Sequence, residues 1–274
     1  MKFWATAIVV CFGAAACGLD VTSDFPPTAT PFATPQLYRA WWQLVEECSD
    51  KSRPLDAVRW YQVRPGELTI RGESAAGAWF VSGNRIVLTS WALREAGLVR
   101  HEMLHAILET GSHPAEYFEG KCGAEVACGL DCTEVHALPN AHQLVLEQLE
   151  GSVALYPPMP SVAALDGRVT VVVKIRNPSN GNAFVSTEHF GQAQCPIGVV
   201  IESTDEPRWT KWMCGWLPAA NGNIYFRPGE TRRLVLDFDM RLRTSMGSFR
   251  PGRITVSSII ADNVRKSLVT TVLP

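Results

Sequence analysis

The sequence has little charge and no excess of basic residues. Charged residues make up 19% of the 274-residue chain, and 25 Lys and Arg stand against 27 Asp and Glu, which gives a net charge of −2. Nucleic-acid-binding domains usually carry a clustered basic surplus, so we expect no nucleic acid among the partners. The 46% of hydrophobic residues can fill a sizeable core, which excludes an intrinsically disordered chain.

Long apolar runs and repeats are also missing. Beyond the N-terminal region, no run approaches the roughly 18 residues that a transmembrane helix needs. The sequence has no heptad pattern, low-complexity tract or internal repeat, which excludes coiled coils and solenoids. The length favours two modest domains.

The first residues are typical of an export signal. Lys2 precedes an uncharged apolar stretch from Phe3 to Ala16, with the length and layout of a signal peptide. The run AAACG at 14–18 resembles a bacterial lipobox, although Ala replaces the usual Leu at its first position. This resemblance implies a signal peptide over 1–16, lipidation of Cys17 and a Pro- and Thr-rich tether over 17–35; ordinary cleavage near Ala16 is the alternative. We expect a lipid-anchored protein of the bacterial cell envelope, on the extracytoplasmic side of a membrane.

The remaining cysteines fit an exported protein. Outside the signal and the anchor there are six: Cys48, Cys122, Cys128, Cys132, Cys195 and Cys214. An even number in an oxidising compartment predicts three disulfides. We favour pairing Cys195 with Cys214, Cys48 with Cys122 and Cys128 with Cys132. A metal site of Cys122, Cys128 and Cys132 near His136 is the rival interpretation, but no CxxC spacing is present.

The region 36–150 mixes helix and strand signals. Leu37, Trp41, Leu44 and Cys48 recur at helical spacing, which predicts a helix over 36–50. Another helix is expected from Ser90 or Trp91 to Glu109 or Thr110, with Gly111 ending it, and a further one over 140–150. Strands are expected over 57–63 and 67–71 and in a hairpin of 78–81 with 85–89.

The pattern becomes that of a β protein after a proline-rich stretch. The segment GSVALYPPMP at 151–160 is typical of a domain boundary. Short β-branched runs separated by turn clusters then fit an antiparallel β-sandwich over 161–274. The strand candidates are 168–176, 183–186, 198–202, 210–213, 231–237, 252–258 and 267–272. The predicted fold class is therefore α+β: a small domain with a short sheet and helices, followed by a sandwich.

The sharpest chemical signal is the motif His101-Glu102-Met103-Leu104-His105, an HExxH. A spacing of four places both imidazoles on one face of a helix, where two nitrogens can reach one Zn²⁺ at about 2.0–2.1 Å. Glu102 then lies beside the metal, where it can deprotonate a bound water. The residues around the motif are apolar on more than one side, which predicts a buried helix.

With this motif, residues 78–119 resemble a zincin metallopeptidase: a hairpin with an edge strand, followed by the HExxH helix. The resemblance covers about 40 residues firmly and perhaps 110 loosely, over 36–150. It implies a Zn²⁺ ion held by His101 and His105, with Glu102 as the general base. It also implies an edge strand that pairs with an extended substrate, for which Arg85–Thr89 is the candidate.

The third metal ligand is left open by the sequence. His113 follows His105 by 8 residues, just past Gly111, and is the favoured candidate. The metzincin pattern HExxHxxGxxH has its glycine and last histidine at other offsets, and the thermolysin-like pattern takes a Glu from a later helix. Glu116 and Glu119 are therefore alternatives, with Glu147 more distant. Tyr117 is a candidate for stabilising an oxyanion.

The C-terminal runs RVTVVVKIRNPSN and FRPGETRRLVLDF resemble immunoglobulin-like modules of bacterial surface proteins. This similarity is architectural and implies substrate binding, spacing from the membrane or regulation. The leading hypothesis is a membrane-anchored zinc metallopeptidase acting on peptides or proteins. The rival is a non-catalytic surface lipoprotein that binds a protein or cell-envelope partner through its sandwich. A zinc hydrolase with another substrate and a proteinase inhibitor are further alternatives.

Overall fold

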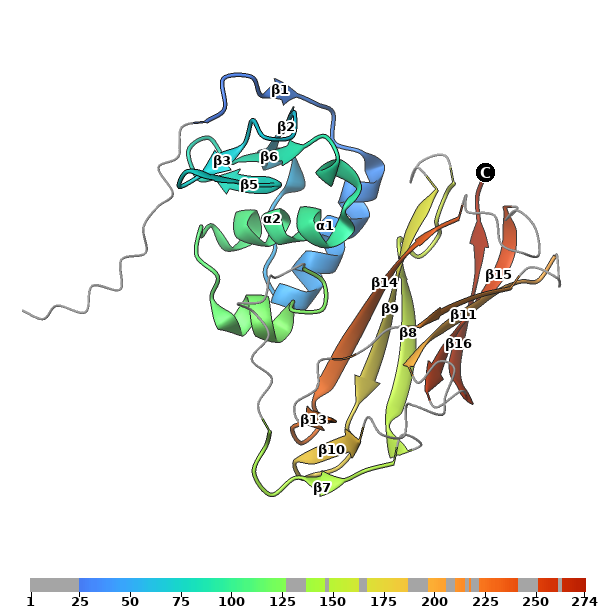
Figure 1. Ribbon diagram of the computed structural model, residues 1–274. Coiled ribbons are helices and arrows are strands. Elements are labelled where there is room, and N and C mark those ends of the chain that lie inside the picture. The colour runs from blue at the N-terminus through green and yellow to red at the C-terminus, as the bar shows by residue number, and fades with distance from the viewer. Residues whose placement is uncertain are drawn as a thin grey trace, which may run out of the picture.

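The computed structural model describes residues 25–126, 137–145, 148–162, 167–186, 197–205, 210–214, 217, 222–240, 251–260 and 263–274. The chain is α+β, as predicted: helices and a short sheet form the N-terminal part, and long antiparallel strands form the C-terminal part (Figure 1). Within these ranges no helix is long and apolar enough to cross a membrane. The lipobox, Cys17 and residues 18–24 of the expected tether lie outside the described residues. The prediction of a tether is wrong for 25–35, because Thr30–Pro31 forms a strand and Phe25 and Phe32 pack against buried clusters of the N-terminal part.

The N-terminal sheet has the strand order β1-β2-β6-β5. Its strands span Thr30–Pro31 (β1), Arg59–Val63 (β2), Gly77–Phe80 (β5) and Arg85–Thr89 (β6), and a small separate ladder joins Thr69–Ile70 (β3) to Glu73–Ser74 (β4). The β5–β6 hairpin is antiparallel, as predicted, whereas β2 and β6 are parallel. The prediction that Arg85–Thr89 is the edge strand is wrong, because β6 is hydrogen-bonded on both sides and β5 forms the edge.

Helix α1 spans Gln36–Ser49, and its predicted stripe of Leu37, Trp41, Leu44 and Cys48 is buried. Helix α2 spans Ala96–Leu108 and contains the HExxH motif. It is buried around most of its circumference, as the lack of a polar face predicted. A separate 3₁₀ turn, η2 (Ala92–Arg94), occupies the expected start of α2, and Glu109 in the left-handed conformation ends the helix before Gly111. A second 3₁₀ turn, η1 (Leu55–Ala57), precedes β2.

The C-terminal part consists of sandwich-like sheets whose strands are antiparallel, except that β7 and β10 pair in parallel. One sheet has the order β14-β9-β8 and another β12-β11-β15-β16; a smaller one has the order β13-β10-β7. Side chains such as Val171, Val173, Val199 and Val256 fill one continuous core between the two large sheets. The strands are β7 (His142–Gln143), β8 (Glu150–Tyr156), β9 (Arg168–Arg176), β10 (Ala183–Ser186), β11 (Ile197–Ser203), β12 (Thr210–Cys214), β13 (Asn223–Phe226), β14 (Thr231–Asp239), β15 (Gly252–Ile260) and β16 (Asn263–Val272).

The segment before residue 160 differs from the prediction. The helix expected over 140–150 does not form: β7 pairs with β10 and β8 begins at Glu150. Asn140 has a positive φ of 53°, and Leu144 and Leu149 both pack into the sandwich core, a spacing that one helix face does not provide. Much of the expected linker at 151–160 is strand β8, which pairs with β9 over its full length. Long-range pairing has overridden the local helical pattern here.

The two parts of the chain are packed against each other. Ala40 and Leu44 of α1 form a buried apolar cluster with Tyr156 of β8 and Val172 of β9. Helix α1 therefore lies on the outer face of the sheet β14-β9-β8 (Figure 1).

Candidate metal centre

Three histidines converge at the end of α2. His101 and His105 lie one turn apart on the helix, and His113 follows after the chain has turned back at Glu109. The Nε2 atom of His101 lies 3.1 Å from Nε2 of His105 and 3.0 Å from Nε2 of His113. The ligands of one tetrahedral ion with 2.0–2.1 Å bonds are about 3.3 Å apart, so the cluster fits a single metal ion. The structure thus brings together the histidine pair and the favoured third candidate.

A hydrogen bond to the backbone fixes the orientation of the His105 ring. Its Nδ1 atom lies 2.7 Å from the Thr110 carbonyl, which can only accept a hydrogen bond. His105 must therefore carry its proton on Nδ1, leaving the Nε2 lone pair directed at the other histidines. Burial, together with the neighbouring His101, lowers the pKa of His105 to about 3, and burial lowers the pKa of His113 as well. Neutral imidazoles are the form that binds metal.

Phe118 packs against the rings of all three histidines. It belongs to η3, a π-helical turn spanning Glu116–Lys121, and is fully buried. Its ring centroid lies 4.7–5.0 Å from those of all three histidines. A disulfide between Cys48 of α1 and Cys122, just after η3, links this turn covalently to α1. On the other side His113 is exposed, so a metal ion there would be open to solvent.

The predicted disulfide Cys48–Cys122 is confirmed, which removes Cys122 from the rival thiolate metal site. Cys214 is also disulfide-bonded. Its expected partner Cys195 lies outside the described residues, as do Cys128, Cys132 and His136.

The alternative third ligands lie elsewhere. In the part of the chain that the structure describes, the metal-ligating groups that converge are the histidines alone. Glu116 is exposed and forms an ion pair with Lys121 at 3.3 Å, and Glu119 is exposed on the same turn. Glu147 is not among the described residues. Tyr117 lines a cavity of about 380 Å³ with Arg53 and Pro114, beside the histidine loop.

The side chain of Glu102 packs between its own helix, α2, and the edge strand β5. Its side chain is 6% exposed, and its carboxylate accepts a hydrogen bond from the backbone N–H of Trp79. Burial raises the pKa of Glu102 to about 8, and the Trp79 hydrogen bond offsets part of this rise. A Cβ atom at Gly77 would lie only 3.1 Å from Glu102 Oε1 and 3.0 Å from Leu98 Cδ2, so a side chain there would crowd the carboxylate.

The sequence did not point to Gly77, Thr110 or Phe118 as parts of this centre. The glycine beginning the strand GAWF was a usable signal, because a strand glycine often marks the close approach of another group. The roles of Thr110 and Phe118 depend on how the chain folds back after Glu109, which has no local signature.

Comparisons with known proteins do not identify the function of this chain. No family model matches the chain, and no match was found among curated proteins. Among solved structures, the chain is similar to an alkylpurine DNA glycosylase from Pseudomonas fluorescens, with 8% identity over 46% of this chain and 31% of that one and a TM-score of 0.33. It is similar to a β-glucosidase from Erythrobacter marinus, with 15% identity over 46% of this chain and 15% of that one and a TM-score of 0.30. The chain thus spans less than a third of either protein, and the similarity is too low to inform function.

Proposed function

We propose that the three histidines bind one Zn²⁺ ion and that the protein is a zinc metallopeptidase with a zincin-like N-terminal domain. The observation that carries this proposal is the convergence of three histidines: Nε2 of His101 lies 3.1 Å from that of His105 and 3.0 Å from that of His113, and the ligand atoms of all three lie within 4.8 Å of one another. Three imidazoles with a solvent-open side are a donor set typical of catalytic zinc. When bound, zinc would supply a Lewis acid and lower the pKa of water to about 7.

Glu102 acts in this proposal as the general base. It follows His101 directly on α2 and is not one of the converging metal-ligating groups, and in an HExxH motif such a carboxylate lies beside the metal and not on it. It takes a proton from the attacking water and passes it to the leaving amine. Its burial favours this proton uptake, because the neutral carboxyl is the better tolerated form in an apolar setting.

The edge strand β5 is suited to orienting an extended peptide. It is hydrogen-bonded to β6 on one side, and in the described sheet no strand covers its other side. A peptide added as a further strand would run beside Trp79, whose backbone contacts Glu102. Strand addition therefore offers a way to bring a peptide bond to the base.

The same proposal places the protein in a bacterial cell envelope. The AAACG run at 14–18 supports a lipid anchor at Cys17, and the buried Cys48–Cys122 disulfide is typical of an oxidising compartment. The sandwich is proposed to be immunoglobulin-like, with a membrane-anchored peptidase unit before it.

Peptidase assays on Glu102→Gln test the proposal. The variant should keep its zinc and lose about 10²–10⁴-fold in peptide cleavage, because it lacks the proton acceptor. Glu119→Gln, an exposed acid on η3, is the matched control and should cleave like the wild type. Zinc-loaded wild type without cleavage of any peptide library would favour the non-catalytic lipoprotein instead.

A further inference from the structure

The outer face of the sheet β14-β9-β8 is a platform for both helices of the N-terminal part. The register places three rows of side chains across it. These rows are Asp237, Thr170 and Tyr156; then Val235, Val172 and Ala154; then Arg233, Lys174 and Ser152. The middle row is apolar and the two outer rows are polar. This face can therefore fix the orientation of a helix that packs on it, as well as bury the apolar side chains of that helix.

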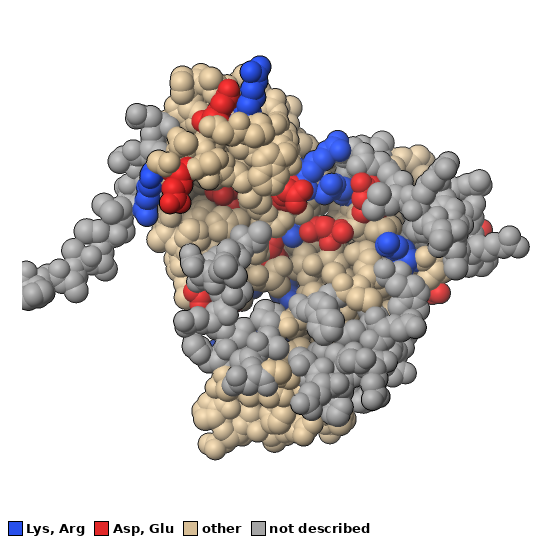
Figure 2. Space-filling view, viewed as in Figure 1, with Lys and Arg blue, Asp and Glu red and all other residues tan. Residues whose placement is uncertain are grey.

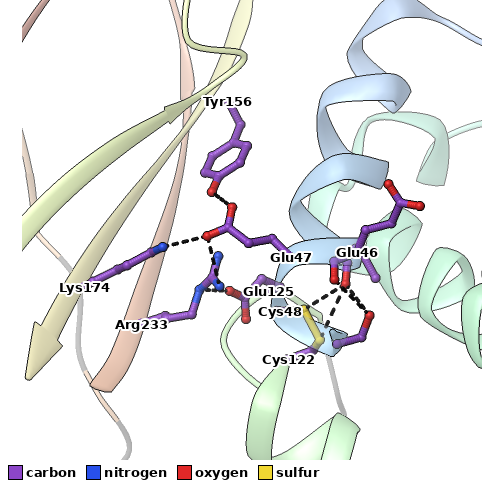
Figure 3. Close-up of polar contacts among 10 residues, drawn as sticks. Glu46, Glu47, Cys48, Cys122, Glu125, Tyr156, Lys174 and Arg233 are labelled. Atoms are coloured by element: carbon purple, nitrogen blue, oxygen red, sulfur yellow. Dashed lines mark hydrogen bonds and ion pairs between the residues drawn. A yellow bond between two sulfur atoms is a disulfide. The ribbon is translucent and has the colours of Figure 1, made fainter. Parts of the chain in front are cut away.

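Helix α1 contacts each row with a matching group. The indole N–H of Trp41 donates to Thr170 Oγ1 at 3.0 Å, and Ala40 and Leu44 pack on Val172. Glu47 pairs with Lys174 at 2.6 Å and accepts a hydrogen bond from the hydroxyl of Tyr156 (Figure 3). These contacts give α1 one fixed position on the sheet.

Helix α2 is connected to the same platform by Arg100, the residue before His101. Its guanidinium donates two parallel hydrogen bonds to Asp237, from Nη1 to Oδ1 at 2.9 Å and from Nη2 to Oδ2 at 3.0 Å. Arg100 is 3% exposed, and Asp237 also accepts a hydrogen bond from Thr170 Oγ1 at 2.6 Å. A bidentate pair of this kind constrains orientation as well as distance.

Glu125 connects the segment after η3 to the same place. Its backbone carbonyl accepts a hydrogen bond from Arg100 Nε at 2.5 Å, and its fully buried carboxylate forms an ion pair with Arg233 of β14 (Figure 3). Glu125 lies three residues beyond Cys122, on the chain that carries His113 and Phe118. Both segments that supply metal ligands are thus connected to the sandwich.

We propose that Asp237 of the sandwich is a positioning residue for the metal centre, acting through Arg100 to set the position of α2 and of its histidines. The β-sandwich is then part of the metal-binding unit and not an independent module. This inference rests on the metal site proposed above, but it does not depend on what the centre hydrolyses.

The test compares metal binding by the full chain with Asp237→Asn, which keeps the shape and removes the charge that Arg100 faces. Zn²⁺ affinity is measured by competition with a chelator, and the site geometry by the visible absorption of the Co²⁺-substituted protein. Glu150→Gln is the matched control, since Glu150 pairs with Arg176 on an exposed part of the same sheet. Thr170→Val removes the hydrogen bond to Asp237 together with the acceptor of the Trp41 indole N–H, but it keeps the Arg100–Asp237 ion pair. It serves as a second variant if Asp237→Asn does not fold.

We expect Asp237→Asn to weaken Zn²⁺ binding about tenfold and to shift the Co²⁺ spectrum, with a smaller effect of Thr170→Val in the same direction. Glu150→Gln should match the wild type in both measurements. Wild-type affinity and spectrum in Thr170→Val and in folded Asp237→Asn would overturn the inference, even if both variants unfold more easily. A wild type that binds neither metal overturns this inference and the proposed function; one that binds zinc but cleaves no peptide overturns only the peptidase.

Discussion

At the scale of single residues, the centre depends on how closely Glu102 and strand β5 approach each other. A buried carboxylate next to a metal site needs room and a hydrogen-bond donor. Gly77 provides the room and the Trp79 backbone provides the donor. Neither contribution involves a reactive side chain, so motif analysis alone could not identify them.

Gly77→Ala should damage catalysis without removing the metal. The new methyl group would lie 3.0–3.1 Å from Leu98 and Glu102, so these side chains would have to shift by a few tenths of an ångström. Because misplacing a catalytic group by about 1 Å can cost 10²-fold, a shift of this smaller size should lower cleavage by roughly threefold to tenfold at unchanged zinc content. Gly181→Ala on the sandwich, where the nearest atom would be 3.5 Å away, is the control. Full activity in Gly77→Ala would contradict the role given to Glu102.

The metal-free protein should lose stability towards alkaline pH because of Glu102. Burial raises its folded-state pKa to about 8, against about 4.3 in an unfolded chain. Its contribution is therefore fully present below about pH 4.3 and is lost as the pH rises through 8, by on the order of a few kcal/mol. Glu102→Gln should lack this loss in urea unfolding at pH 5 and pH 9.

The acid side of the same experiment is an internal control. The folded-state pKa of His105 is lowered to about 3, so its contribution is present above about pH 6.5 and is lost as the pH falls towards 3. Below about pH 4.3, where Glu102 is protonated in both the folded and the unfolded state, wild type and Glu102→Gln should lose stability in parallel. Parallel curves at alkaline pH as well would show that Glu102 is not buried as described.

At the scale of elements, locally encoded features were predictable and those set by distant partners were not. Helix α1 and the β5–β6 hairpin follow from periodicity and turn residues, and α2 lies where the HExxH motif required a helix. The edge position of β5 depends on the parallel pairing of β2 with β6, which no local pattern reveals. For the same reason residues 140–150, with helical spacing, were predicted as a helix although they belong with β7 and β8.

The Cys48–Cys122 disulfide connects two such elements, and removing it should weaken both the fold and the metal site. It closes a loop with a sequence separation of 74 residues, which corresponds to roughly 4 kcal/mol in the chain-entropy model. A Cys48→Ala/Cys122→Ala variant should lose stability of this order in urea and bind zinc more weakly, since η3 carries Phe118. Unchanged zinc affinity in the folded variant would mean that η3 holds its place without the disulfide.

At the scale of the whole molecule, the distribution of surface charge does not indicate a particular kind of ligand. Acidic and basic side chains are interspersed on the face shown in Figure 2, and much of its described surface is uncharged. The informative feature is the interface between the two parts, which buries Leu44 and Val172 and includes the Arg100–Asp237 pair. The sequence predicted two units in this order but contained no sign that they would share a buried apolar cluster.

Such an interface predicts cooperative unfolding. Leu44 is fully buried against the sandwich, so Leu44→Ala should cost about 2–5 kcal/mol and shift a single transition seen by fluorescence and circular dichroism. Val269→Ala, at a side chain that is 60% exposed, should have little effect. Two separate transitions, with only one shifted, would show that the parts unfold independently.

If His101, His105 and His113 form one metal site, the zinc content of the purified protein must depend on all three histidines. Zinc would be measured per chain in the purified protein, in His113→Ala and in the control His142→Ala, whose histidine is exposed on β7. We expect about one equivalent of zinc in the wild type and the control, and much less in His113→Ala. Equal zinc in all three proteins, or none in the wild type after incubation with excess metal, would contradict a single site of these three histidines.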